Sequence, residues 1–189
     1  MQVSCGTKHT LFLDIFGKAF AAGSNKTGRM GISQEHRRGV QYSPIPVEIE
    51  NRLQQVAAGD SHSLFLTQKE GLVFACGDNS LGQLGQDLSG EKLAFLSKPV
   101  QVKGLRYIKE ILCRKYSMAL ANDGHLFMWG NGSLANYGLI PTRICSLPNK
   151  VSTISIGDSH MCATDEEGIL WVWGKNKKGE LGLGDSTPR

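Results

Sequence analysis

One block of residues occurs four times along this chain, and this repetition constrains the fold more than any other feature. The tetrapeptide Gly-Asp-Ser-His stands at 59–62 and again at 157–160, and in each case short apolar runs follow that end in glycine. A third copy starts at His9, and a fourth, weaker copy starts at Tyr116. A repeated unit of this kind predicts an array of identical structural elements rather than one catalytic centre.

Glycines recur at fixed offsets in all copies, and these offsets define the repeat register. The recurring glycines are Gly17, Gly71, Gly124 and Gly168, then Gly23, Gly77, Gly130 and Gly174, and finally Gly31, Gly85, Gly138 and Gly182. Such glycines mark turns that need a positive φ or a close backbone approach. The segments between them are short and rich in β-branched, aromatic and small apolar residues, which predicts strands.

The connections between copies predict further strands. Proline-containing candidates lie at 44–49, 98–105 and 141–147, and another candidate precedes the next copy, as at 53–59 and 151–157. Together with the strands inside each copy, these segments give about four strands per repeat, which is typical of a blade of a β-propeller. The sequence therefore predicts an all-β fold built from consecutive meanders.

The motifs of the copies resemble the repeat of the regulator of chromosome condensation (RCC1) family. They include VSCGTKHTLFL at 3–13 and NSLGQLG at 79–85, each followed by a proline-containing strand. The resemblance covers nearly the whole chain and implies an RCC1-like β-propeller, whose full domain has seven blades. We expect a single partial propeller domain over 1–189, with repeat cores at 3–31, 56–85, 110–138 and 154–182.

The length of the chain fits only part of such a ring. Its 189 residues supply about three and a half to four blades, whereas seven blades would need on the order of 350 residues at this period. An open arc leaves an unpaired edge or flank at each end, which closed propellers avoid. We therefore expect either a fragment of a longer protein or an arc completed by a second copy or another subunit.

The third copy departs from the pattern at its turns. Cys113, Tyr116 and Ala135 stand where the other copies have glycine, histidine and glycine. These replacements predict either a blade that is distorted at its turns or an altered face used for contact.

Cysteine usage predicts a protein of a reducing, intracellular compartment, cytoplasmic or nuclear. Five cysteines without a CxxC pair argue against both a disulfide framework and a zinc site. Cys5, Cys76, Cys113 and Cys162 fall in predicted strands, where we expect small buried apolar residues. No apolar run is long enough to span a bilayer, and no signal peptide is visible, so we expect no membrane partner.

The recurring histidines are predicted to be structural. His9, His62 and His160 take the same position in three blades, which spreads them around the propeller instead of gathering them on one metal ion. We expect each to form a hydrogen bond within or between blades. We expect no catalytic residue, no metal and no cofactor.

Loops are the expected sites of partner binding, because a propeller is a rigid scaffold whose connections carry specificity. The long connection at 86–97 ends in an apolar cluster, which is either an exposed anchor for a partner or a buried strand. Two other loops contain basic residues, which either bind an acidic partner or are simply solvated. The candidate partner-binding residues are Leu93, Phe95, Leu96, Arg37, Arg38, Lys175, Lys177 and Lys178.

These features predict a non-catalytic protein-interaction scaffold within a larger protein or complex. The resemblance adds an alternative, because some members of the family are guanine-nucleotide exchange factors for a small GTPase. Candidate partners are therefore proteins, either a small GTPase or subunits of a large assembly. Nucleic acid or chromatin is a weaker candidate, because the basic residues form no stripe with interleaved aromatics.

Overall fold

The structure, a computed structural model, describes residues 1–32, 39–86, 94–130 and 138–189. Within these residues the chain forms strands and no α-helix, and hence no helix that could cross a membrane. The first sheet contains β1 (Gln2–Cys5), β2 (His9–Leu13), β3 (Ala19–Ser24) and β4 (Val40–Pro46). The second contains β5 (Leu53–Ala58), β6 (His62–Thr67), β7 (Val73–Asp78) and β8 (Phe95–Gln101).

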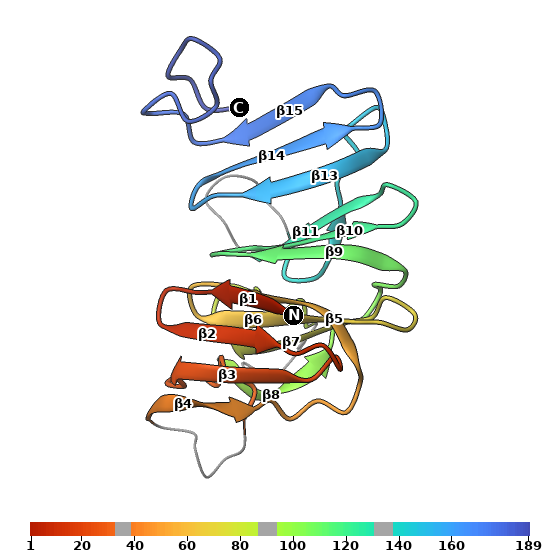
Figure 1. Cartoon of the computed structure of the whole chain (residues 1–189). Coiled ribbons are helices and arrows are strands. Elements are labelled where there is room, and N and C mark those ends of the chain that lie inside the picture. The colour runs from red at the N-terminus through yellow and green to blue at the C-terminus, as the bar shows by residue number, and fades with distance from the viewer. Residues whose placement is uncertain (33–38, 87–93, 131–137) are drawn as a thin grey trace.

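The third sheet repeats this four-stranded arrangement, and the fourth has three strands. The third contains β9 (Ile108–Cys113), β10 (Ser117–Ala121), β11 (Leu126–Trp129) and β12 (Thr142–Arg143). The fourth contains β13 (Val151–Ile156), β14 (His160–Asp165) and β15 (Leu170–Gly174). Each sheet is an antiparallel meander in chain order, so the predicted all-β architecture of consecutive blades is confirmed, and the sheets are called blades 1 to 4 (Figure 1).

The first strands of the blades lie against one another along the inner side of the arc. Glutamine side chains join them, because Gln2 Oε1 accepts a hydrogen bond from Val56 N at 2.9 Å. Gln55 forms two such bonds, donating to Ile111 O at 3.0 Å and accepting from Ile111 N at 2.8 Å. Backbone groups that would otherwise end at the edge of each sheet are thus satisfied by the next blade.

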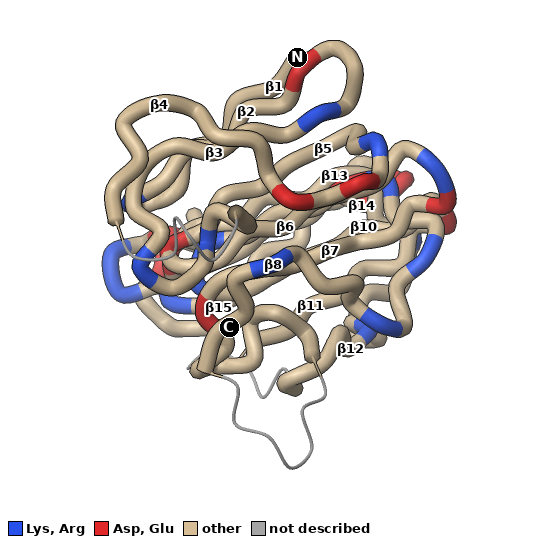
Figure 2. The backbone as a smooth tube through the Cα atoms, turned by 90° about the horizontal axis from the view of Figure 1, so that it is seen from below, with Lys and Arg blue, Asp and Glu red and all other residues tan. Residues whose placement is uncertain are grey.

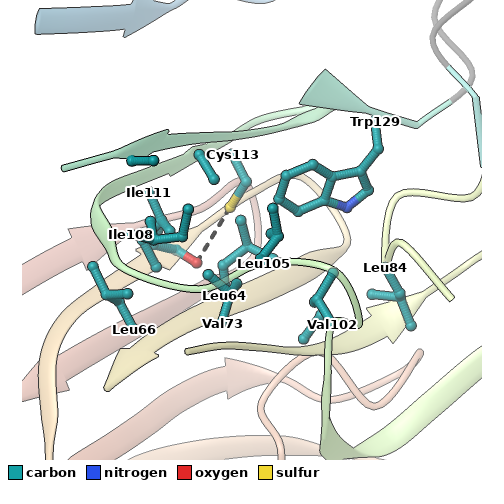
Figure 3. Close-up of a cluster of buried hydrophobic side chains, with 14 residues drawn as sticks. Leu64, Leu66, Val73, Leu84, Val102, Leu105, Ile108, Ile111, Cys113 and Trp129 are labelled. Carbon is teal, nitrogen blue, oxygen red and sulfur yellow. Dashed lines mark hydrogen bonds between the residues drawn. The ribbon is translucent and has the colours of Figure 1, made fainter. Parts of the chain in front are cut away.

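The hydrophobic core lies between the blades. One buried cluster joins residues of blades 1 and 2, including Leu11 and Phe65, and a second joins blades 2 and 3 around Leu64 and Trp129 (Figure 3). A third cluster, which includes Met118, joins blades 3 and 4. Because each cluster uses residues from two adjacent sheets, no blade has a complete core of its own.

The outermost strands begin earlier in the chain than predicted, because the prediction placed each start next to a proline. β4 starts at Val40 and contains Pro44 and Pro46, while β8 starts at Phe95 and contains Pro99. An outermost strand pairs on one side only, so a proline without an N–H is tolerated there. The predicted segments 44–49 and 98–105 therefore overlap only the later parts of these strands, which end at Pro46 and Gln101.

The third blade has a shortened turn, which corrects the alignment of its sequence. In blade 2, Gly59 N donates to His62 O, whereas the equivalent bond of blade 3 runs from Arg114 N to Tyr116 O. Arg114, and not Cys113, therefore takes the place of the glycine, and the turn has one residue fewer. The strands on both sides of this turn remain paired, so in the described part of the blade the predicted distortion consists of this local deletion and the short β12. Ala135 lies outside the described residues.

Candidate interaction surface and blade interfaces

The repeated Gly-x-x-His turns lie at one end of the blades, together with the segments that follow the third strands. Thr7 N donates to Gly59 O at 3.3 Å, and Asp60 N donates to Arg114 O at 3.0 Å, so the turns of blades 1, 2 and 3 contact one another. Ser24 N donates to Lys8 O at 2.8 Å and brings the end of β3 to the same place. We call this end the histidine-turn face, formed by residues 6–8, 25–32, 59–61, 79–86, 114–116, 157–159 and 175–189.

His9 connects blade 1 to blade 2. Its Nε2 lies 2.8 Å from Ser63 Oγ, and Ser63 Oγ in turn donates to Arg29 O at 2.5 Å. Because the serine hydrogen is used on the carbonyl, the histidine is the donor and carries its proton on Nε2. The predicted structural role of His9 between blades fits this contact.

The same arrangement joins blade 2 to blade 3. His62 Nε2 lies 2.9 Å from Ser117 Oγ, and Ser117 Oγ donates to Gln83 O at 2.7 Å. The indole Nε1 of Trp129 donates to the same carbonyl at 2.9 Å. The second residue of the GQLG segment, Gln83, therefore supplies the backbone acceptor that holds the next blade.

Both histidines are held in the neutral form. Burial lowers the pKa of His9 to about 3 and that of His62 to about 4, with the positive charge of Arg29 contributing in the same direction. Asp78 opposes the shift at His62. A buried, neutral histidine with a serine partner is suited to holding two blades together.

The histidine ring, together with a backbone carbonyl of the next blade at Gly6 and Gly59, explains the glycine three residues before each histidine. A Cβ at Gly6 would lie 2.7 Å from His9 Cε1, and a Cβ at Gly157 would lie equally close to His160 Cε1. At Gly59 the added atom would also lie 2.6 Å from Arg114 O. Blade 3 has Tyr116 in the position of the histidine, and the exposed Arg114 stands in its turn where the other blades have glycine.

His160 has no counterpart of these serine contacts. Its ring is half-buried, and within the described part of the chain no neighbouring hydroxyl accepts its Nε2. Its place is on the outer flank of blade 4, where a further blade would have to supply the hydroxyl.

The predicted partner-binding residues fall into three groups. Leu93, Arg37 and Arg38 lie outside the described residues. Phe95 and Leu96 begin β8: Leu96 packs against the core between blades 2 and 3, while Phe95 is 39% exposed. Lys175, Lys177 and Lys178 are exposed on the histidine-turn face. The three lysines are accessible to a partner. Leu96 lies in a strand that packs on the core, as the alternative interpretation predicted.

Further basic residues, which the sequence analysis did not single out, share this face. Lys8, Lys26, Arg114 and Lys115 are exposed in its turns. Lys8 is far from Arg114 and Lys115 in the chain, and only the contacts between the turns bring these residues to the same face. The repeat alignment could have indicated this, because equivalent turns of adjacent blades must be neighbours.

The acidic residues of this face are fewer and less exposed. Asp60, Asp78 and Glu180 are half-buried, and Asp158 is exposed. Asp60 and Asp78 accept hydrogen bonds from Thr7 and Gln83. In the described part of the face the one ion pair lies between Arg189 and Asp185, so the lysines and arginines of its turns keep their charges unpaired.

Other surfaces carry a more balanced charge. Lys98 pairs with Glu48 at 3.1 Å, and Arg106 lies 3.8 Å from Glu70. Figure 2 shows that charged residues lie mainly on the loops and that the strands carry few of them. The histidine-turn face therefore differs from the opposite end of the blades by its excess of unpaired positive charge.

A shallow cavity of about 580 Å³ lies on the inner side of the arc. Gln2, Gln55, Lys109 and Glu110 line it with Gln54 and Ser152. Burial raises the pKa of the Glu110 carboxyl, while Lys109 acts in the opposite direction. Two of these side chains, Gln2 and Gln55, already bond the next blade, and among the described residues no group of three or more metal-binding side chains lies here or elsewhere.

Comparison with known families identifies the repeat. A sequence profile described as "Regulator of chromosome condensation (RCC1) repeat" matches residues 17–66 and 70–120. A second profile of the same description matches residues 54–83 and 151–180.

Known proteins and structures resemble the chain over nearly its whole length. The ultraviolet-B receptor UVR8 of Arabidopsis thaliana is 30% identical over 98% of this chain and 43% of its own length. The RCC1-like G exchanging factor-like protein of Mus musculus is 29% identical over 97% of this chain and 55% of its own length. The crystal structure of human WBSCR16 superposes with a TM-score of 0.86 at 26% identity and covers all of this chain and 51% of its own. The chain thus spans about half the length of these relatives.

Proposed function

The chain belongs to the regulator of chromosome condensation (RCC1) repeat family, and on this premise we propose that it is a non-catalytic scaffold that binds an acidic protein surface through its histidine-turn face. The observation that carries the proposal is the set of exposed, unpaired basic residues on that face. This set is Lys8, Lys26, Arg114, Lys115, Lys175, Lys177 and Lys178. The described part of the opposite end has no comparable excess.

The backbone beneath these residues is rigid. The backbone of Lys8 is held by Ser24 of its own blade, and that of Arg114 by Asp60 of the neighbouring blade. The buried His9 and His62 contacts fix the blades themselves. A charged surface on a fixed backbone loses little backbone entropy when a partner binds. Unpaired positive charges also accelerate the encounter with an acidic partner, and this effect weakens as salt is added.

The proposal is tested by reversing charge on each end of the blades. One variant combines Lys8→Glu, Arg114→Glu and Lys115→Glu, and its matched control combines Lys69→Glu, Lys103→Glu and Arg106→Glu at the opposite end. Binding to an immobilised poly-glutamate probe is measured at increasing salt. We expect the first variant to lose at least about tenfold in affinity, as removal of several charge contacts predicts, and the control to bind like the unmodified chain.

An equal loss in both variants would contradict a specific face, because net charge alone would then explain binding. Duplex DNA is measured in parallel as a phosphate-bearing competitor. Tighter, face-dependent binding to DNA than to poly-glutamate would replace the acidic protein by nucleic acid as the partner.

Guanine-nucleotide exchange on a small GTPase is the second candidate function. It is supported by the likeness to the RCC1-like G exchanging factor-like protein of Mus musculus. Exchange requires a surface that deforms the nucleotide site of the GTPase and needs no catalytic side chain of the scaffold, so the same face could serve it. Release of a fluorescent GDP analogue from a panel of small GTPases is the test, and release that is unchanged by the chain across the panel would exclude this activity for the 189 residues.

A further inference from the structure

An arginine stands three residues before a serine at two places in this chain, Arg114 before Ser117 and Arg143 before Ser146. This spacing is a charge pattern by which one class of serine and threonine protein kinases selects its substrates, because acidic side chains of the kinase pair with the arginine. The sequence alone does not distinguish the two serines, but their surroundings in the fold do.

Ser117 is not accessible to an enzyme. It lies in β10 and is fully buried, and its hydroxyl donates to Gln83 O while it accepts from His62 Nε2. Phosphorylation at this position would require the interface between blades 2 and 3 to open first. The arginine at the right spacing therefore does not make Ser117 a substrate of the folded chain.

Ser146 has the opposite surroundings. It lies in the connection between β12 and β13 and is exposed. Its hydroxyl has no hydrogen-bond partner among the described residues. A cavity of about 340 Å³ beside this connection is lined by the neighbours Cys145 and Leu147 but not by Ser146, so the serine hydroxyl faces solvent.

The connection that carries Ser146 has one residue more than its two counterparts. Backbone hydrogen bonds fix its two ends, at Ile144 and Val151. The equivalent bonds fix the ends of 47–53 and of 102–108, so this segment is longer by one residue. A longer segment between equivalent anchor points has more slack, which an acceptor needs if it is to leave the surface and enter the cleft of a kinase.

Few hydrogen bonds hold this connection between its ends. Residues 145–149 form no backbone–backbone hydrogen bond within the described part of the chain, whereas Tyr107 N in the connection between blades 2 and 3 donates to Glu70 O at 2.8 Å. The anchors of 145–149 are side chains, since Leu147 packs partly on the core between blades 3 and 4 and the Asn149 amide donates one hydrogen bond to blade 4. Such a segment opens locally at a lower free energy than the blades do.

The arginine of the motif is also free to contact a kinase. Arg143 is the last residue of β12, is exposed, and has no ion-pair partner among the described residues. Its guanidinium therefore offers a charge-assisted contact without first losing another. On the other side of the serine, Pro148 restricts Leu147 to an extended backbone, which keeps the acceptor segment out of a helix.

We propose that Ser146 is the phosphorylation site of a protein kinase that selects serines with an arginine three residues before them. In the reaction, Ser146 Oγ attacks the γ-phosphorus of ATP bound to the kinase, the bond from this phosphorus to the β–γ bridging oxygen breaks, and ADP leaves. The hydroxyl proton passes to the catalytic aspartate of the kinase. The phosphoserine adds up to about two negative charges at the end of the blades opposite the histidine-turn face, so the proposal does not depend on the acidic partner of that face.

Phosphorylation of the full chain in vitro tests the proposal. The folded chain is incubated with magnesium, ATP and a panel of arginine-directed kinases, and tandem mass spectrometry locates the phosphate. We expect Ser146 to be the main site and Ser117 to stay unmodified. Ser146→Ala should remove most of the incorporated phosphate.

A second variant separates recognition from the acceptor hydroxyl. Arg143→Ala retains Ser146 and should lower kcat/KM of the kinase at least about tenfold, as the loss of one charge-assisted contact predicts. Arg106→Ala removes the same charge from the connection between blades 2 and 3. It is the matched control and should react like the unmodified chain. Melting curves confirm that all three variants are folded.

Three results would contradict the proposal. Phosphate on Ser117 with Ser146 unmodified, or equal incorporation into the Ser146→Ala variant, would overturn the site. An equal loss in Arg143→Ala and Arg106→Ala would overturn the role of Arg143, because net charge would then explain recognition. Absence of phosphate at Ser146 with every kinase of the panel would overturn the proposal as a whole.

Discussion

Gly28 in blade 1 and Gly179 in blade 4 have the same place in the repeat and nearly the same backbone, with φ of +75° and +77°. Around Gly28 the backbone of β8 leaves no room for a side chain, whereas around Gly179 there is open space. His62 and His160 differ similarly, since only His62 has a serine from the next blade. A repeat residue therefore acquires its energetic importance from the neighbouring blade rather than from its own sheet.

The largest expected contrast comes from replacing each of these glycines with alanine. Gly28→Ala adds a clash with the backbone of blade 2 to the strain of a positive φ, and we expect it to lower the free energy of unfolding by about 4 kcal/mol or more. Gly179→Ala adds the strain alone, about 1 kcal/mol. Urea unfolding followed by circular dichroism measures both. Equal losses would show that backbone strain, and not the neighbouring blade, makes glycine necessary.

The histidines give a smaller contrast of the same kind. His62→Ala leaves a cavity and removes the donor to Ser117, so we expect a loss of about 3 kcal/mol. His160→Ala removes a half-buried ring without a serine partner, and we expect a loss below about 1 kcal/mol. Thermal melting compares the two variants with the unmodified chain. A larger loss at His160 would contradict the assignment of these contacts.

Acid should weaken the same interfaces. The pKa values of His9 and His62 in the folded protein, about 3 and about 4, lie below the ordinary value of 6.5, so the unfolded chain binds more protons. The stabilisation is complete above pH 6.5 and declines as the pH falls toward these values. Between pH 7 and pH 6 we expect a loss on the order of 1 to 2 kcal/mol from the two groups together.

The double variant His9→Gln, His62→Gln is the control for this pH dependence. Glutamine does not titrate, and its amide can still donate a hydrogen bond. Chemical unfolding at both pH values should show a much smaller difference in this variant. An unchanged difference would place the acid-sensitive groups elsewhere.

Much of the fold could be predicted from the sequence because the repeat is visible in its glycines and apolar runs. The all-β blades and the strands before each Gly-x-x-His turn are confirmed. The predicted starts of β4 and β8 were wrong. Proline was treated as the first residue of each strand, although an edge strand tolerates proline within it. The alignment of Cys113 with a glycine was also wrong, because a one-residue deletion in a turn leaves no trace in the apolar pattern.

The candidate surface was predictable only in part. Lys175, Lys177 and Lys178 adjoin in the sequence and could be recognised as a basic cluster. Lys8, Arg114 and Lys115 could not, because their proximity depends on hydrogen bonds between the turns of different blades. Of the buried cysteines that were predicted, Cys76 and Cys113 are buried, whereas Cys5 is exposed and Cys162 is half-buried.

The sequence by itself determined the repeated unit, its strands and its turns, because these depend on local spacing, on apolar alternation and on glycine at positions of positive φ. Only the tertiary structure decided which repeat positions carry stability and which stay open, because the core and the histidine contacts lie between sheets. Cys162 and Leu64 occupy equivalent strand positions, yet Leu64 is fully buried and Cys162 is not. The difference is that a neighbouring blade covers Leu64 but not Cys162. The repeat pattern of one sheet does not specify how that sheet packs against the next.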